Sequence, residues 1–178
     1  MSKFSVEYHI KSSYQKTLQS LKQYYEEKNY FDIEILSVEE IQKLNLDDFD
    51  LEYIQYVVLE SSSNGWTIIV SDYNRDENLV KFISQKCQCP ALYGHNNDST
   101  DNWRWIYFEE GNIIDEYWYL GQEKDKGYRI GEGDQIKNLY NIFKAKGTKY
   151  LHEIFSHILS SNMNFCVMRI NKEAHLIS

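Results

Sequence analysis

Apolar and polar residues alternate along several short stretches of the chain, and the most strongly patterned stretch is Asn102–Leu120. This stretch holds three of the four tryptophans. In its first half Trp105 and Tyr107 point to one face of an extended strand, while Ile106 and Phe108 point to the other. A strand that is apolar on both faces lies inside a covered sheet, or carries a recognition surface on its back.

Two tight turns indicate that strands pair as hairpins. Glu110-Gly111 divides the aromatic stretch into two arms, and Asn64-Gly65 separates Ile54–Leu59 from Trp66–Val70. An Asn-Gly pair supplies the positive φ angles that a short hairpin turn needs. Three further apolar stretches predict strands: Phe4–Ile10, Ala91–Tyr93 and Phe165–Ile170.

Apolar residues at helical spacing predict helices between these strands. The first runs from about Ser13 to Lys28. Ser37 and Glu40 have the spacing of a capping box for a short second helix. Asp76 is a suitable N-cap for a third, which ends near Lys86. Two more stripes, at residues 136–143 and 151–159, predict helices near the C-terminus.

The order of these elements predicts the architecture. Short connections between strands favour hairpins, so we expect an α+β fold: a mainly antiparallel, twisted sheet of about six or seven strands with helices packed on it. Gly121–Gly133 is rich in glycine and charge and predicts a surface loop. The 178 residues contain no repeat or linker-like break, so we expect residues 1–178 to form one domain.

Charge is distributed unevenly along the chain. The formal net charge is −8, and Glu26–Glu60 holds eleven acidic residues against two lysines, a local balance of −9. Such a segment repels nucleic-acid phosphates and attracts a basic protein, although it could also be a solvated face that keeps the chain soluble. We therefore expect no nucleic-acid partner and favour a basic protein partner.

The same sequence argues for a cytoplasmic location. No apolar run reaches the 18 to 20 residues or so of a membrane span, so we expect no membrane association. The chain has three cysteines, an odd number, and its N-terminus shows no apolar secretory segment. Reduced thiols in a cytosol fit this usage.

The motifs that resemble reactive sites each lack a necessary part. His152 and His157 are five residues apart, which rotates them away from the common helical face that a zinc site needs. Cys87 and Cys89 have one residue between them rather than the two of a redox motif, so we expect packing roles for both. The sequence predicts no catalytic residue, no cofactor and no metal site.

Part of the chain resembles a set of uncharacterised bacterial proteins. The matching features, in sequence order, are Gly65-Trp66-Thr67, Leu79–Ser84, Cys89–Tyr93, Glu110-Gly111-Asn112, Ile114-Asp115 and Tyr117. The stretch Asn64–Tyr119 also looks like the small, acidic, aromatic-rich domains among bacterial toxin-immunity proteins. The polar insert at His95–Thr100 departs from the pattern. The resemblance implies a binding protein and supplies no active site.

These observations favour a non-catalytic, protein-binding domain of the immunity or adaptor type. Its acidic, aromatic-rich surface would capture a basic protein partner. The residues expected to form that surface are Glu39, Glu40, Asp47, Asp48, Asp50, Glu52, Trp103, Trp105, Tyr117 and Trp118.

An alternative is a small-ligand domain or hydrolase. Its pocket, lined by aromatic residues and carboxylates, would lie between the aromatic sheet and the C-terminal helices. The carboxylates that flank the aromatic turn, Glu109, Glu110, Asp115 and Glu116, are expected instead to be solvated.

Overall fold

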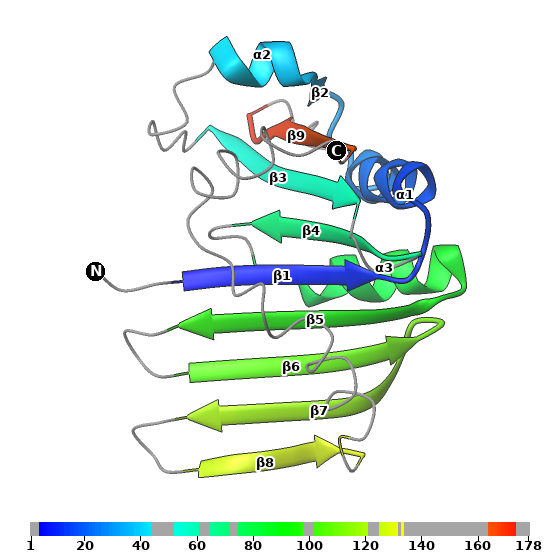
Figure 1. Ribbon diagram of the computed structural model, residues 1–178, viewed down its shortest axis with the longest axis vertical. Coiled ribbons are helices and arrows are strands. Elements are labelled where there is room, and N and C mark those ends of the chain that lie inside the picture. The colour runs from blue at the N-terminus through cyan, green and yellow to red at the C-terminus, as the bar shows by residue number, and fades with distance from the viewer. Residues whose placement is uncertain are drawn as a thin grey trace.

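The computed structural model describes residues 4–43, 52–60, 65–71, 75–97, 102–120, 125–131, 133 and 164–173. Within these residues, nine strands form one sheet in the order β2-β9-β3-β4-β1-β5-β6-β7-β8 (Figure 1). All neighbouring strands pair antiparallel. The strands are β1 Phe4–Ile10, β2 Ile33–Leu36, β3 Tyr53–Glu60, β4 Thr67–Ser71, β5 Pro90–Asn97, β6 Asn102–Glu109, β7 Asn112–Leu120, β8 Asp125–Ile130 and β9 Phe165–Asn171. The helices are α1 Tyr14–Glu26, α2 Val38–Lys43 and α3 Glu77–Cys87.

The expected α+β class is confirmed, and the sheet is larger than expected because two strands were not predicted. β8 lies in Gly121–Gly133, which was expected to be a loop, and this expectation was wrong for Asp125–Ile130. Backbone pairing with β7 makes this segment a strand despite its glycine content. β2 has only four residues, and its two central side chains, Glu34 and Ile35, are both exposed. It therefore lacks the alternation that identifies a strand.

The helix starts agree with the sequence prediction. The Ser13 hydroxyl accepts a hydrogen bond from the Lys16 backbone N–H at the start of α1. The Asp76 carboxylate does the same for Leu79 at the start of α3. The two helices predicted near the C-terminus lie outside the described residues. Among the helices that the structure describes, none is both long and apolar enough to cross a bilayer.

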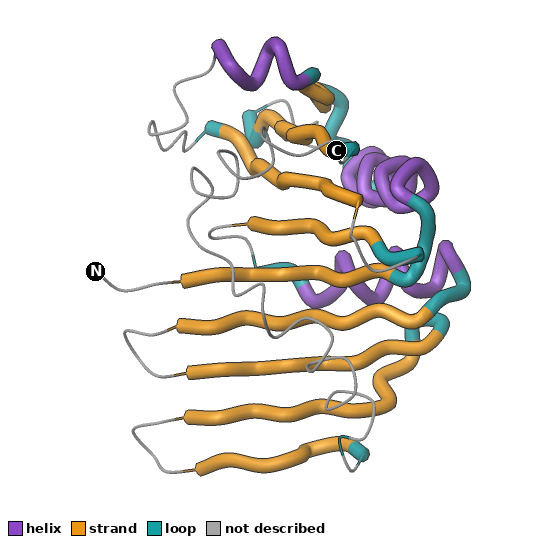
Figure 2. The backbone as a smooth tube through the Cα atoms, in the orientation of Figure 1, coloured by secondary structure: helices purple, strands orange, loops and turns teal. Residues whose placement is uncertain are grey.

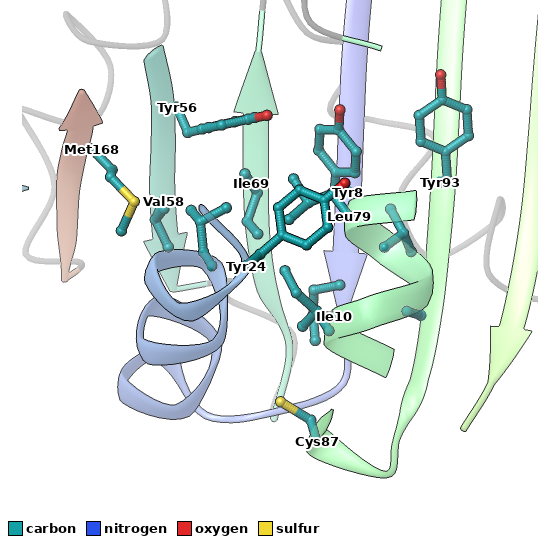
Figure 3. Close-up of a cluster of buried hydrophobic side chains, with 14 of the residues drawn as sticks. Tyr8, Ile10, Tyr24, Tyr56, Val58, Ile69, Leu79, Cys87, Tyr93 and Met168 are labelled. Atoms are coloured by element: carbon teal, nitrogen blue, oxygen red, sulfur yellow. The ribbon is translucent and has the colours of Figure 1, made fainter. Parts of the chain in front are cut away.

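Helices α1 and α3 pack side by side on one face of the sheet, which we call the helix face (Figure 2). The core between them and the strands consists of alternate strand residues and the inner sides of both helices (Figure 3). Its fully buried members include Tyr8, Ile10, Leu21, Tyr56, Val58, Ile69, Leu79, Ile83, Ile106 and Met168. Burial of this apolar layer stabilises the sheet at about 25 cal/mol per Å².

The other side of the sheet, here the opposite face, carries two smaller apolar clusters. In one, Ile41 of α2 packs with strand residues such as Val57 and Val167. In the other, Trp66, Leu92 and Tyr107 pack with Trp105 and Tyr117. The predicted alternation in β6 is confirmed, since Ile106 and Phe108 belong to the helix-face core whereas Trp105 and Tyr107 lie on the opposite face.

The predicted turn between β6 and β7 is also confirmed. Glu109 pairs with Asn112, and the two residues between them both have positive φ angles, 50° at Glu110 and 83° at Gly111. This is the signature of a type I′ hairpin turn, whose twist matches that of the strands.

Candidate functional site

Acidic side chains gather at the end of the sheet that β2 forms. β2 is the last strand in the sheet order and pairs on one side with β9. α2 follows it along the chain and lies at the same end (Figure 1). Residues 31–43 hold four carboxylates, all exposed, and one lysine. These carboxylates belong to Asp32, Glu34, Glu39 and Glu40.

Glu52 belongs to the same region although it is distant along the chain. It is exposed and directly precedes β3. Its carbonyl oxygen accepts a hydrogen bond of 2.8 Å from the Lys172 backbone N–H, which places it beside the end of β9. We call residues 31–43 together with Glu52 the acidic edge.

Large apolar side chains are exposed among these carboxylates. Phe31 is 60% exposed and Ile35 is 45% exposed, the two largest values among the exposed large apolar residues in the described ranges. Ile35 pairs with Met168 of β9 and so lies on the helix face of the sheet. Apolar groups ringed by charge are the usual composition of a protein-binding patch.

A capping box holds α2 in place. The Ser37 backbone N–H donates to the Glu40 carboxylate at 2.7 Å, and the Glu40 backbone N–H donates to the Ser37 hydroxyl at 3.3 Å. The first of these hydrogen bonds lowers the pKa of Glu40, so this carboxylate stays ionised. Ile41 is buried on the opposite face of the sheet, and this anchor leaves Glu39 and Glu40 on the exposed side of the helix.

The sequence-predicted acidic residues are only partly placed by the structure. Glu39, Glu40 and Glu52 come together at the acidic edge. Asp47, Asp48 and Asp50 lie outside the described residues. Phe31 and Ile35 were not predicted, because a hydrophobic residue in sequence carries no sign of whether a neighbouring element will cover it.

The aromatic residues predicted for the same surface lie elsewhere. Trp105 and Tyr117 are half-buried on the opposite face, in β6 and β7. Trp118 is half-buried on the helix face, where it pairs with Arg104. The side chain of Trp103 lies outside the described residues.

This hairpin and the acidic edge are far apart. β6 is six places from β2 in the sheet order, which at about 4.8 Å per strand corresponds to roughly 29 Å. The acidic and aromatic candidates that the structure describes therefore do not form one patch.

A charged cluster on β6 and β7 was missed by the sequence reasoning. The Arg104 guanidinium donates to Glu116 at 2.9 Å and 2.7 Å, and it also pairs with Glu77 at the start of α3. Glu116 is 6% exposed and Asp115 is 4% exposed. The expectation that these two carboxylates are solvated was wrong, because Arg104 compensates the first and the Gly133 backbone N–H donates to the second. The sequence carried no signal for this cluster, because Arg104 and Glu116 reach one face only through a register shift between Tyr107 and Phe108.

Tyrosine hydroxyls form a polar layer inside the helix-face core (Figure 3). The Tyr24 hydroxyl donates to the Asp76 carboxylate at 2.6 Å, and the Asp76 backbone N–H donates to the Tyr8 hydroxyl. The hydroxyls of Tyr25 and Tyr56 are hydrogen-bonded to each other at 2.5 Å. Burial raises the pKa of Tyr8, Tyr24 and Tyr56, so these groups remain neutral. Their hydrogen bonds give this layer a structural role.

Neither a metal-binding group, a ligand pocket nor a similar protein identifies a function for the described residues. Across the described ranges, no three side chains of His, Cys, Asp or Glu are grouped in a way that could hold a metal ion. The C-terminal helices that would close a ligand pocket lie outside those ranges. Comparison with known proteins found no matching family model, curated protein or solved structure.

Proposed function

We propose that this chain is a non-catalytic protein-binding domain whose acidic edge captures a basic protein partner. The observation that carries the proposal is the exposure of Phe31 and Ile35 among the carboxylates of residues 31–43 and Glu52. The carboxylates attract a basic surface and speed its approach. The two apolar side chains supply contact area that loses water when the partner binds.

The geometry of β2 supports a partner that docks along the sheet edge. A strand at the edge of a sheet presents backbone N–H and C=O groups along its outer side. β2 also places Glu34 and Ile35 on opposite faces. An extended partner segment with a basic residue and an apolar residue in alternation would match both groups at once.

The acidic edge is a better candidate than the aromatic hairpin. Trp105 and Tyr117 are half-buried and pack against Trp66, Leu92 and Tyr107, so they are already part of a cluster of the chain itself. Phe31 has more of its surface exposed than any other large apolar residue that the structure describes as exposed. The hairpin aromatics therefore have less surface to offer a partner.

The proposal places the chain in the cytoplasm. Cys87, Cys89 and Cys166 are all free thiols in the structure. Unpaired cysteines are typical of proteins kept in a reducing compartment.

A capture experiment with matched charge reversals tests the proposal. The chain is immobilised and exposed to a lysate of the cells that produce it, and bound proteins are identified by mass spectrometry at low and moderate salt. We expect a basic protein to bind in stoichiometric amount and to be released by salt, because charge attraction between exposed groups is screened. The double variant Glu34→Lys/Glu39→Lys should bind roughly tenfold less of it, the equivalent of about 1.4 kcal/mol.

Glu110→Lys serves as the matched control. Glu110 is an exposed glutamate in the turn between β6 and β7, at the other end of the sheet. Its reversal alters net charge as a single reversal at Glu39 does but leaves the acidic edge intact, so capture should persist. Equal loss from Glu110→Lys and Glu39→Lys would show that net charge alone matters, and no bound basic protein at all would contradict the proposal.

A further inference from the structure

Cys87 lies at the end of α3, on the side of the core away from the tyrosine hydroxyls (Figure 3), and a second thiol, Cys89, follows two residues later. Cys87 is the last residue of the helix, and Cys89 directly precedes β5. Gln88, between them, has φ 49° and ψ 54°, the left-handed helical conformation. A hydrogen bond of 3.1 Å from the Cys89 backbone N–H to the Ser84 carbonyl fixes this turn.

The conformation of Gln88 brings the two cysteines within the reach of a disulfide. The left-handed region is the mirror image of the right-handed one, so residues on either side of Gln88 have the separation of residues two apart in an α-helix. That separation is about 5.4 Å between Cα atoms. Disulfides span about 4.4 to 6.8 Å between Cα atoms. In an extended strand, the same two residues would lie about 6.7 Å apart, at the limit of this range.

The groups around Cys87 favour its thiolate form. The Ser20 hydroxyl lies 3.4 Å from the Cys87 sulfur, within hydrogen-bond reach of it. The Lys16 ammonium donates to the Cys87 carbonyl oxygen at 3.2 Å, which offsets the negative end of the helix dipole.

The pKa values of the two thiols are shifted in opposite directions. Hydrogen bonding from Cys89, opposed by burial, lowers the pKa of Cys87 to about 6, whereas that hydrogen bond and burial raise the pKa of Cys89. Cys87 is therefore the thiol of the pair that ionises first and acts as the nucleophile. Cys166 provides the contrast within the same molecule, since burial raises its pKa.

We propose that Cys87 and Cys89 form a redox-active dithiol that hydrogen peroxide oxidises to an intramolecular disulfide. The Cys87 thiolate attacks one peroxide oxygen, the O–O bond breaks, and the leaving hydroxide takes up a proton to give water and a Cys87 sulfenic acid. The Cys89 sulfur then attacks the Cys87 sulfur and displaces hydroxide, which takes up the proton that Cys89 releases. Two thiols and one peroxide thus give one disulfide and two waters. The site is independent of the acidic edge.

The test follows the three thiols of the full-length chain during oxidation. The folded protein is treated with hydrogen peroxide at pH 7, quenched in denaturant with an alkylating agent, and analysed by intact-mass and peptide mass spectrometry. We expect Cys87 and Cys89 to lose alkylation together, with a mapped Cys87–Cys89 disulfide. We expect this loss to be roughly tenfold faster than that of Cys166, because the thiolate is the reactive form. Equal rates for Cys87 and Cys166 would overturn the proposal.

A second measurement separates the roles of the two thiols. Cys89→Ala removes the attacking thiol, so Cys87 should accumulate as a sulfenic acid that dimedone labels. The pH midpoint of Cys87 oxidation should lie below the ordinary pKa of a thiol in the wild type and move upward in Cys89→Ala, because Cys89 is the largest influence that lowers the pKa of Cys87. An unchanged midpoint, or Cys87 oxidation that requires denaturant, would also overturn the proposal.

Discussion

Trp105 packs so closely against Gly94 that no side chain fits between them. The two residues are paired across β5 and β6, and a Cβ atom at position 94 would lie 2.5 Å from the nearest atom of the Trp105 ring. The glycine is therefore required by packing on the opposite face of the sheet rather than by its backbone conformation. A sequence alone marks such a glycine only as an interruption in a strand.

The first prediction concerns this contact. Gly94→Ala should lower the free energy of unfolding by about 1–3 kcal/mol, because the Trp105 ring must move out of its cluster. Urea unfolding followed by circular dichroism measures the change. In a Trp105→Leu background, which removes the ring, the same substitution should have less than about half of that effect. An equal loss in both backgrounds would show that Trp105 is not the obstacle.

His95 gives a second prediction at this scale. Burial is the largest cause that lowers its pKa, to about 4, and the charges of Arg75 and Arg104 add to this effect. The unfolded chain takes up the proton first, near pH 6.5. The stability that the neutral imidazole contributes is thus complete above pH 6.5 and is lost as the pH falls from about 6.5 to about 4.

The measurement compares urea unfolding at pH 7 and pH 5 in the wild type and in His95→Gln. The imidazole is partly exposed, and solvent screening reduces the effect, so we expect a difference of about 1–2 kcal/mol at most between the two pH dependences. The wild type should lose more stability on acidification. If both proteins lose the same amount, His95 does not titrate as inferred.

Local signals explain which elements were predictable. The capping hydrogen bonds of α2 and α3 each lie within one helical turn, so the sequence identified where these helices start. They join Ser37 to Glu40 and Asp76 to Leu79. β2 and β8 were missed because they depend on pairing with β9 and β7 rather than on their own composition.

Ser84 joins three elements and gives the third prediction. Its buried hydroxyl donates to the Cys89 carbonyl at 2.7 Å and accepts from the Gly111 backbone N–H at 3.0 Å. It thereby connects α3, the start of β5 and the turn between β6 and β7. Ser84→Ala leaves both backbone groups without this partner and should lower the free energy of unfolding by about 2–4 kcal/mol. Gln85→Ala, an exposed neighbour, should change stability by less than about 0.5 kcal/mol.

Thermal and urea unfolding measure the stability of both variants. A loss in Ser84→Ala but not in Gln85→Ala shows that the hydroxyl, rather than a general change in the helix, is responsible. Hydrogen exchange should also show faster exchange at the Gly111 amide in Ser84→Ala. A variant as stable as the wild type would show that water replaces the hydroxyl.

For the whole molecule, the sheet order determines which groups act together. The excess of acidic residues was visible in the sequence, and Glu39, Glu40 and Glu52 do lie at one end of the sheet. The separation of this end from Trp105 and Tyr117 could not be predicted, because it depends on β9 inserting between β2 and β3 and on the four further strands between β9 and β6. The exposure of Phe31 depends on the same arrangement. We therefore propose that partner binding occurs at one end of the sheet rather than on a combined acidic and aromatic surface.

Hydrogen exchange of the chain with and without its captured partner tests this assignment most directly. Mass spectrometry of peptides follows backbone amides in both the acidic edge and the aromatic hairpin in one experiment. We predict that the partner slows exchange within residues 31–43 and leaves Asn102–Leu120 unchanged. Protection confined to Asn102–Leu120, or no protection in residues 31–43, would contradict the assignment of the binding surface to the acidic edge.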